Sequence, residues 1–237
     1  MVKSRFSKVM ALLVLSVIVL SSSAYASQST NSIKVTGHAV VTAAPDVAYI
    51  TLGVETKSNS AASSSEENAA AVANVIAKLK EFGLTDSEIT TSNYNIYSYQ
   101  DYDRITDPQT YVTVYYVRNQ LNIKTNRLSE VGKIIDLAIR AGANQVQGIK
   151  FDLEDKSELQ LLALKNATKQ AAAKAKAIAE AANVEIASLI NVTEEYEYYA
   201  PYTEVNMFRS AAAGIADTQI NPSDVEVTAR IVAEYGF

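Results

Sequence analysis

The chain has 237 residues, no cysteine, a single histidine and a formal charge of −5. Without cysteine it can form no disulfide, thiolate nucleophile or zinc–thiolate site. The acidic balance argues against nucleic acid or anionic lipid as a partner, because both require a basic face. A chain of this length can bury one large core or two smaller ones.

The first 26 residues have the layout of a secretory signal peptide. Three basic residues (Lys3, Arg5 and Lys8) precede the apolar run Val9–Leu20, and Ala24-Tyr25-Ala26 follows it. The apolar run has 12 residues, fewer than the ~20 that a membrane-spanning helix needs. We therefore expect cleavage after residue 26 and no stable membrane insertion, with an uncleaved anchor as the alternative. The mature chain would begin at Ser27, would carry a charge of −8 after losing three basic residues, and would lie outside the cytoplasm, in the periplasm, at the cell surface or secreted.

The first third of the expected domain combines strand and helix patterns. Residues 27–32 form a polar leader, and residues 33–41 and 46–56 have the composition and alternation of strands. An amphipathic helix follows, with Ser63, Ser64 and Ser65 as candidate N-caps. Gly83 is expected to end that helix in a left-handed conformation.

Two tyrosine-rich segments, 89–102 and 111–124, form the most conspicuous pair in the chain. Both are rich in Tyr, Val, Thr and Ile, which favour strands. The segment between them contains Asp107-Pro108, which is typical of a turn. We therefore predict a long β-hairpin.

The second half continues the same alternation of helices and strands. Helices are expected at 127–141 and 156–182, ending at Gly142 and Asn183, and strands at 145–155, 184–194 and 224–235. Because neighbouring strands are joined by short turns, an all-parallel sheet is excluded. The predicted fold class is α+β, with a mixed, largely antiparallel sheet packed against three helices and a long hairpin. It would form a single domain over residues 33–236.

The apolar residues of 195–223 follow neither the helical nor the strand period. This segment is therefore predicted to be a long loop. Connections of more than ~15 residues are uncommon inside a compact domain and are usually functional or disordered. This segment is apolar for a loop, and it contains Tyr198, Tyr199, Tyr202 and Phe208. Such a segment is expected to lie against another surface.

Short motifs in a fixed order give the chain a family resemblance. Together they resemble the SIMPL-domain proteins, which include bacterial periplasmic immunogenic and oxidative-stress-defence proteins. The resemblance implies an exported α+β protein that forms large ring-like or channel-like oligomers, and it brings no catalytic residues. The motifs are Val35-Thr36-Gly37, Ala43-Ala44-Pro45-Asp46, Gly53-Val54-Glu55, Asn68, Ile89-Thr90-Thr91-Ser92-Asn93-Tyr94, Val117-Arg118-Asn119, Ala141-Gly142-Ala143-Asn144, Gly148-Ile149-Lys150-Phe151, the Ala/Lys-rich helix and Val225-Glu226-Val227-Thr228-Ala229.

The residues that could carry chemistry are few. His38 could serve as the base of a Ser-His-Asp site, but the sequence has no serine on a Gly-x-Ser-x-Gly elbow. It is better explained as a residue on a strand face. Asp101, Asp103 and Asp107 crowd one turn but lack the rest of an EF-hand loop, so a solvated hairpin tip is favoured over calcium. Asp152 and Glu154 could perform acid–base work only in a cleft, and a solvated strand face is favoured. We therefore predict no catalytic residue, no metal and no cofactor.

The tyrosines are the remaining signal, since half of the 14 lie between residues 94 and 116. Plain cross-strand packing within the hairpin and a subunit interface are both open explanations for them. The preferred hypothesis is a non-enzymatic, self-associating protein of the cell envelope or surface, tied to oxidative-stress defence by the resemblance alone. A small-ligand or peptide module with an aromatic groove is the alternative, and a hydrolase that uses acidic residues is the third. The predicted interface residues are Tyr97, Tyr99, Tyr102, Tyr115, Tyr198, Tyr199, Tyr202 and Phe208.

Overall fold

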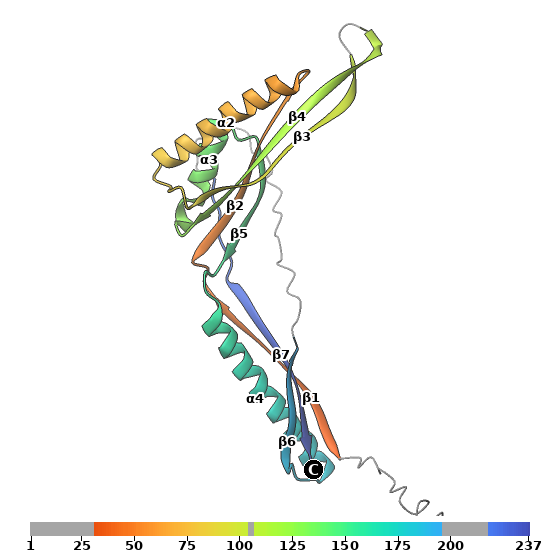
Figure 1. Cartoon of the computed structure of the whole chain (residues 1–237). Coiled ribbons are helices and arrows are strands. Elements are labelled where there is room, and N and C mark those ends of the chain that lie inside the picture. The colour runs from red at the N-terminus through yellow and green to blue at the C-terminus, as the bar shows by residue number, and fades with distance from the viewer. Residues whose placement is uncertain (1–30, 104–106, 196–217) are drawn as a thin grey trace, which may run out of the picture.

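The computed structural model describes residues 31–103, 107–195 and 218–237. In these ranges the chain builds two antiparallel sheets with helices packed on them, one above the other in an elongated molecule (Figure 1). The elements are β1 (Ser32–Ala43), β2 (Val47–Ser58), α2 (Ala61–Glu81), β3 (Ile89–Asp103), β4 (Asp107–Thr125), the 3₁₀ turn η1 (Leu128–Glu130), α3 (Val131–Ala141), β5 (Gln145–Asp152), α4 (Ser157–Ala182), β6 (Ser188–Glu195) and β7 (Val225–Gly236).

The upper unit is a four-stranded sheet of order β3-β4-β2-β5 with α2 and α3 on one face. Alternating residues of β2, such as Ile50 and Leu52, point into a core shared with the apolar stripe of α2. Asn68 of α2 is also buried there, and its Nδ2 donates to the carbonyl oxygens of Val54 and Val117 at 2.9 and 3.0 Å. This amide therefore joins the helix to two neighbouring strands.

The lower unit is a three-stranded sheet of order β1-β7-β6, on which α4 packs along β1 and β7. The buried stripe of α4 consists of alanines: Ala163, Ala167, Ala171, Ala175 and Ala179. These small side chains let the helix axis approach the sheet closely. Gly37 of β1 lies under the helix, where an added Cβ would come within 2.0 Å of the carbonyl oxygen of Ala167.

The chain passes between the two units at a junction where separate segments meet. Asp46, between β1 and β2, donates its backbone N–H to the carbonyl of Asp152 at the end of β5. The Asp46 carboxylate accepts from the backbone N–H of Glu154, in the link that leads from β5 into α4. A third link joins α3 to β7, because Thr218 donates to both carboxylate oxygens of Asp136 and Ile220 packs on the upper core.

The predicted α+β class, the long hairpin and the three helices are confirmed. The strands form two sheets, and every pairing in them is antiparallel. The predicted helix stops at Gly83, Gly142 and Asn183 are also confirmed, since all three residues have positive φ. The expected signal peptide, the leader through residue 30, and residues 196–217 of the predicted loop lie outside the described residues.

Several predicted boundaries were wrong. Strand β4 begins at Asp107, within the segment predicted as the hairpin turn, and α3 begins at Val131, after the 3₁₀ turn η1. Helix α2 begins earlier, with Ser60 as its N-cap, because Ala61 and Ala62 are good helix formers and Ser64 is buried against Thr56. Strand β5 ends at Asp152, whose carboxylate turns back to bind lysines. Strand β6 begins only at Ser188, because residues 184–187 form the connection in which Val184 and Ile186 cover the core.

The close contact of β1 with α4 gives a test of the lower core. Gly37→Ala should destabilise the protein by about 1–3 kcal/mol, because its Cβ would overlap the helix backbone. Gly148→Ala is the matched control, since no atom lies within 4 Å of its added Cβ. Urea unfolding measures both, and equal midpoints for the two variants would contradict this packing.

Candidate functional site

The β3–β4 hairpin carries most of the exposed aromatic surface of the described chain. Its strands pair from Ile89 opposite Ile123 outward to Tyr102 opposite Tyr111. Tyr97 and Tyr99 lie on one face, with Tyr116 directly across from Tyr97. The rings of Tyr97 and Tyr116 are nearly parallel with centroids 5.4 Å apart, and Tyr99 meets both edge-on. Such pairs stabilise a ribbon by about 0.5–1.5 kcal/mol each.

A charged pair borders this aromatic cluster. In the register between β2 and β4, Glu55 lies opposite Arg118, whose Nη2 is 2.6 Å from Glu55 Oε2. Tyr97 donates its hydroxyl to the same oxygen at 2.9 Å, and its ring lies 5.8 Å from the Arg118 guanidinium carbon. Burial alone raises the pKa of Glu55, but the bonds from Arg118 and Tyr97 outweigh it and hold this pKa below 4.5. The pair therefore stays ionised and fixes the Tyr97 ring.

The opposite face of the hairpin turns toward α2. Val117 is fully buried there, and the Tyr94 hydroxyl lies 3.4 Å from Ser65 Oγ of the helix. One face of the inner half of the hairpin therefore covers the upper core. Tyr94 and Ile96 remain 53% and 43% exposed, so the helix covers this face only in part.

The outer half of the hairpin is a two-stranded ribbon. Strand β2 ends at Ser58, opposite Tyr115, and β4 residues before that position pair with β3 alone. In Figure 1 this part projects past the end of α2. Tyr99 and Tyr111 are 64% and 57% exposed on it. This part of the hairpin therefore leaves an aromatic surface exposed beyond the sheet.

The predicted interface residues divide into two groups. The structure brings Tyr97, Tyr99 and Tyr115 to the hairpin and pairs the Tyr102 backbone with Tyr111, while the Tyr102 side chain is outside the described residues. Tyr198, Tyr199, Tyr202 and Phe208 also lie outside the described residues. The predicted set omitted Tyr116, Glu55 and Arg118. Only the family motifs that contain Glu55 and Arg118 pointed to them, because the β2–β4 register is not visible in the sequence.

The other residues considered for catalysis or metal binding are His38 and the aspartates of the hairpin turn. His38 is exposed on β1, opposite Arg230, as expected of a residue on a strand face. Within the described residues, no three His, Asp or Glu side chains lie close enough together to hold a metal ion. The side chains of Asp103 and Asp107, in the candidate calcium turn, lie outside the described residues.

The Asp152 prediction needs correction, because this carboxylate does not lie on a solvated strand face. It is 7% exposed and binds Lys150 at 2.8 Å and Lys156 at 2.5 Å. Burial alone raises the pKa of Asp152, but the two lysines and the Leu153 N–H lower it below 3.8. Glu154 lies beyond the strand, and its pKa is lowered by Lys124 and Asn126. A general acid needs a raised pKa, so the pair is not arranged for acid catalysis.

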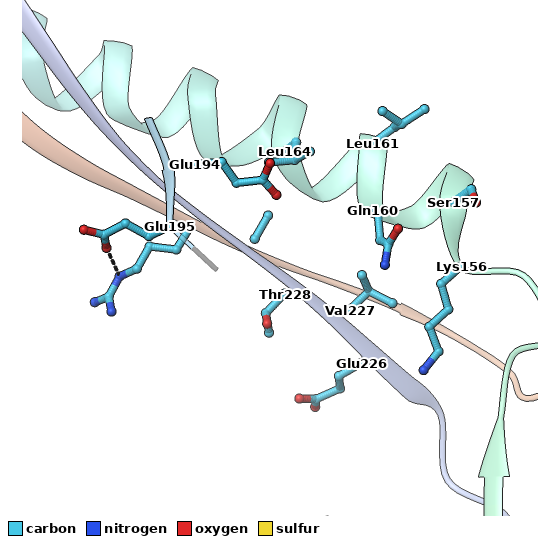
Figure 2. A pocket seen from close by; sticks show the side chains of 12 residues that line it. Lys156, Ser157, Gln160, Leu161, Leu164, Glu194, Glu195, Glu226, Val227 and Thr228 are labelled. Atoms are coloured by element: carbon cyan, nitrogen blue, oxygen red, sulfur yellow. Dashed lines mark ion pairs between the residues drawn. The ribbon is translucent and has the colours of Figure 1, made fainter. Parts of the chain in front are cut away.

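A groove of about 580 Å³ lies in the lower unit, between the start of α4 and strand β7. Leu161 and Leu164 line it from the helix, and Val227 and Ala229 line it from the strand. Glu195 and Arg230 form an ion pair at its far end (Figure 2). No described tyrosine lines this groove, so it is not the aromatic groove of the alternative hypothesis.

The described residues form an α+β protein with an exposed aromatic hairpin in one unit and a groove in the other. The model of the SIMPL family, described as a protein of unknown function, matches residues 33–235. The chain therefore belongs to the SIMPL family.

Relatives in several bacteria agree with this assignment. The 26 kDa periplasmic immunogenic proteins of Brucella melitensis and Brucella abortus are 32% and 31% identical to the chain over 165 residues, which cover 68% of this chain. The chain spans 66% of the length of these relatives. The uncharacterized protein YggE of Escherichia coli K12 is 22% identical over 180 residues, which cover 76% of this chain and 72% of YggE.

The two ion pairs that Asp152 forms with Lys150 and Lys156 (the Asp152 clamp) predict a pH-dependent contribution to stability. Asp152→Asn should lower the free energy of unfolding at pH 7 by about 1–3 kcal/mol, because a buried, doubly paired carboxylate is lost. The folded-state pKa is depressed, so this stabilisation is complete above the ordinary value of 3.8 and declines as the pH falls from there through the folded pKa.

Urea unfolding of both proteins from pH 7 down to pH 2.5 measures this effect. The difference between wild type and variant should shrink below pH 3.8. A difference that is constant over the whole range would show that the charge of Asp152 does not stabilise the junction. Within the described residues no helix is long and apolar enough to cross a membrane.

Proposed function

We propose that this SIMPL-family protein is exported and acts outside the cytoplasm as a non-enzymatic, self-associating component of the cell envelope or surface. Its first 26 residues have the layout of a signal peptide, and the Brucella relatives are named periplasmic. The link to oxidative-stress defence stays a prediction that rests on the family resemblance.

The outer half of the β3–β4 hairpin is the observation that carries self-association. It extends beyond its sheet as a two-stranded ribbon with Tyr99 and Tyr111 exposed on opposite faces. Tyrosine is favoured at protein interfaces, because its ring buries apolar area and its hydroxyl stays hydrogen-bonded. Arg118 and Glu55 at the base of the ribbon hold Tyr97 in one orientation before any partner binds. A preorganised surface loses less conformational entropy on association.

A second copy of the chain is the proposed partner, and two surfaces supply the contact. One is the outer hairpin, which includes Tyr97, Tyr99, Tyr102 and Tyr115. The other is the segment with Tyr198, Tyr199, Tyr202 and Phe208, which leaves the lower unit after Glu195 and rejoins the upper unit at Thr218. The acidic charge gives no reason to expect nucleic acid as a partner.

Removing the exposed rings tests the hairpin. The chain from Ser27 should have a solution mass several times that of one chain, measured by light scattering after size exclusion. The double variant Tyr99→Ser, Tyr111→Ser should shift this mass toward that of a single chain, because each ring is more than half exposed.

Tyr49→Ser is the matched control for this variant. Tyr49 is 38% exposed on the same sheet but lies on β2 opposite Lys150, away from the ribbon. A single-chain mass for the unmodified protein at every concentration would overturn self-association. An unchanged mass in the double variant would place the interface elsewhere.

The 196–217 segment is tested by replacing it with a Gly/Ser linker of equal length. Thr218 and Ile220 are left intact, because they contact α3 and the upper core. Loss of the assembly with unchanged thermal unfolding of the single chain would support this segment as part of the interface. An assembly that persists would limit the interface to the hairpin.

A further inference from the structure

The face of the upper sheet that points away from α2 and α3 carries a band of uncharged polar side chains. Its residues alternate along β2 and β4 with core residues such as Leu52 and Leu121. The register of the four strands aligns these polar residues in two neighbouring rows, which we call the amide patch and which contain no ionisable side chain. Across β3, β4, β2 and β5 the rows are Asn93-Gln120-Gly53-Gln145 and Thr90-Asn122-Thr51-Gly148.

The side-chain amides of this patch keep much of their hydrogen-bonding capacity. Gln147 of β5 also belongs to the patch, because a Cβ added to Gly53 would lie 3.6 Å from its Nε2. Among the described residues, no side chain or backbone group bonds to the amides of Gln120 and Gln147. Asn122 uses only its Oδ1, which accepts from the hydroxyls of Thr51 and Ser92 at 3.2 Å. Each free amide offers two N–H donors and a carbonyl acceptor, so the patch presents both kinds of group to a ligand.

The charges next to the amide patch select against a charged ligand. In the two bordering rows, the charged side chains of β2, β4 and β5 are all paired. Arg118 binds Glu55 on one side of the patch. On the other side Lys124 and Lys150 form ion pairs with acidic residues at the end of β5 and just beyond it. The patch therefore suits an uncharged ligand with many hydroxyl groups, because a hydroxyl both donates and accepts hydrogen bonds.

Tyrosine rings lie beyond both ends of the amide patch. Tyr49, opposite Lys124, is 38% exposed at one end, and Tyr116, stacked on Tyr97, lies at the other. Tyr116 and Lys124 are eight residues apart on β4, a span of ~27 Å at 3.4 Å per residue. An extended chain that carries hydroxyls at regular intervals would engage the whole patch, whereas a compact molecule would leave most of the amides unused. The apolar faces of tyrosine rings complement the C–H faces of sugar rings.

We propose that the amide patch binds a neutral, extended glycan chain that lies along the sheet between Tyr116 and Tyr49. Gln120 and Gln147 hydrogen-bond its hydroxyl groups, and the tyrosine rings pack on its sugar rings. Gly148 leaves room for the chain at the edge of the patch, since no atom lies within 4 Å of a Cβ added there. A protein exported as its N-terminal sequence predicts would meet such chains in the cell envelope.

Affinity electrophoresis of the chain from Ser27 tests the proposal with soluble β-1,4-linked polysaccharides in native gels. Hydroxyethylcellulose and glycol chitin are the neutral probes, and their carboxymethyl counterparts carry the same backbones with negative charge. At least one neutral probe should retard the protein. The carboxymethyl form of that backbone should bind about ten-fold more weakly, because the patch offers no unpaired cation to its carboxylates.

Variants of the patch complete the test. The double variant Gln120→Ala, Gln147→Ala should weaken binding of the neutral probe about ten-fold, because two side chains that hydrogen-bond the ligand are lost. Gln160→Ala is the matched control, since Gln160 is an exposed amide on α4, outside the upper sheet. Thermal unfolding by circular dichroism confirms that each variant is folded.

Two further variants separate glycan binding from self-association. Tyr49→Ser should weaken glycan binding and leave the solution mass unchanged, because Tyr49 lies at the end of the patch and away from the outer hairpin. The double variant Tyr99→Ser, Tyr111→Ser should keep glycan binding, because neither ring belongs to the patch.

Three outcomes would overturn the proposal. The first is a mobility that neither neutral polysaccharide changes. The second is equal retardation of the unmodified protein and the folded Gln120→Ala, Gln147→Ala variant, which would place any glycan site elsewhere. The third is equal retardation by a neutral polysaccharide and its carboxymethyl counterpart, which would exclude recognition by an uncharged face.

Discussion

Strand β4 holds the upper unit together, and its length relative to β2 determines what the protein presents to its surroundings. It is hydrogen-bonded to β3 on one side and to β2 on the other, and its buried residues Val117, Leu121 and Ile123 belong to the core strands. Where β2 ends at Ser58, β4 continues with β3 alone. Inside the sheet the tyrosines are braced by Glu55 and Arg118, and beyond it they are exposed. The same ladder thus produces a stable unit and a projecting aromatic ribbon.

The junction at Asp46 and Asp152 lies between the unit that carries the hairpin and the unit that carries the α4–β7 groove. The hairpin projects from one end of the upper unit, while the α4–β7 groove belongs to the lower unit. Asp152 binds lysines on both sides of the junction, one from β5 and one from the start of α4. Lys156 is shared between this clamp and the groove.

Much of the fold could be predicted from local patterns. The alternation in β2 and β7, the apolar stripes of the helices and the positive-φ stops at Gly83, Gly142 and Asn183 are local signals, and they gave the right elements. The division into two sheets and the pairing of β1 with β7 were not predictable, because strands nearly 200 residues apart leave no local trace of their register. The ends of β5 and β6 depend on tertiary contacts of Asp152 and Ile186, which override the local preference for strand.

The candidate surfaces were predicted less completely. The excess of tyrosine singled out the hairpin as a candidate surface, but it gave no sign of Glu55 and Arg118, which meet only through the β2–β4 register. The groove escaped sequence reasoning altogether. It lies where the start of α4 packs beside β7, a tertiary contact that no local pattern shows.

The account depends most on the claim that the outer hairpin is buried between copies of the chain. Hydrogen–deuterium exchange of the mature chain at increasing protein concentration tests this claim directly, with the exposed strand β6 as an internal reference. Slower exchange of the amides of residues 97–103 and 107–116 at high concentration, with β6 unchanged, is the predicted result. Exchange of the hairpin that stays the same at every concentration would contradict it.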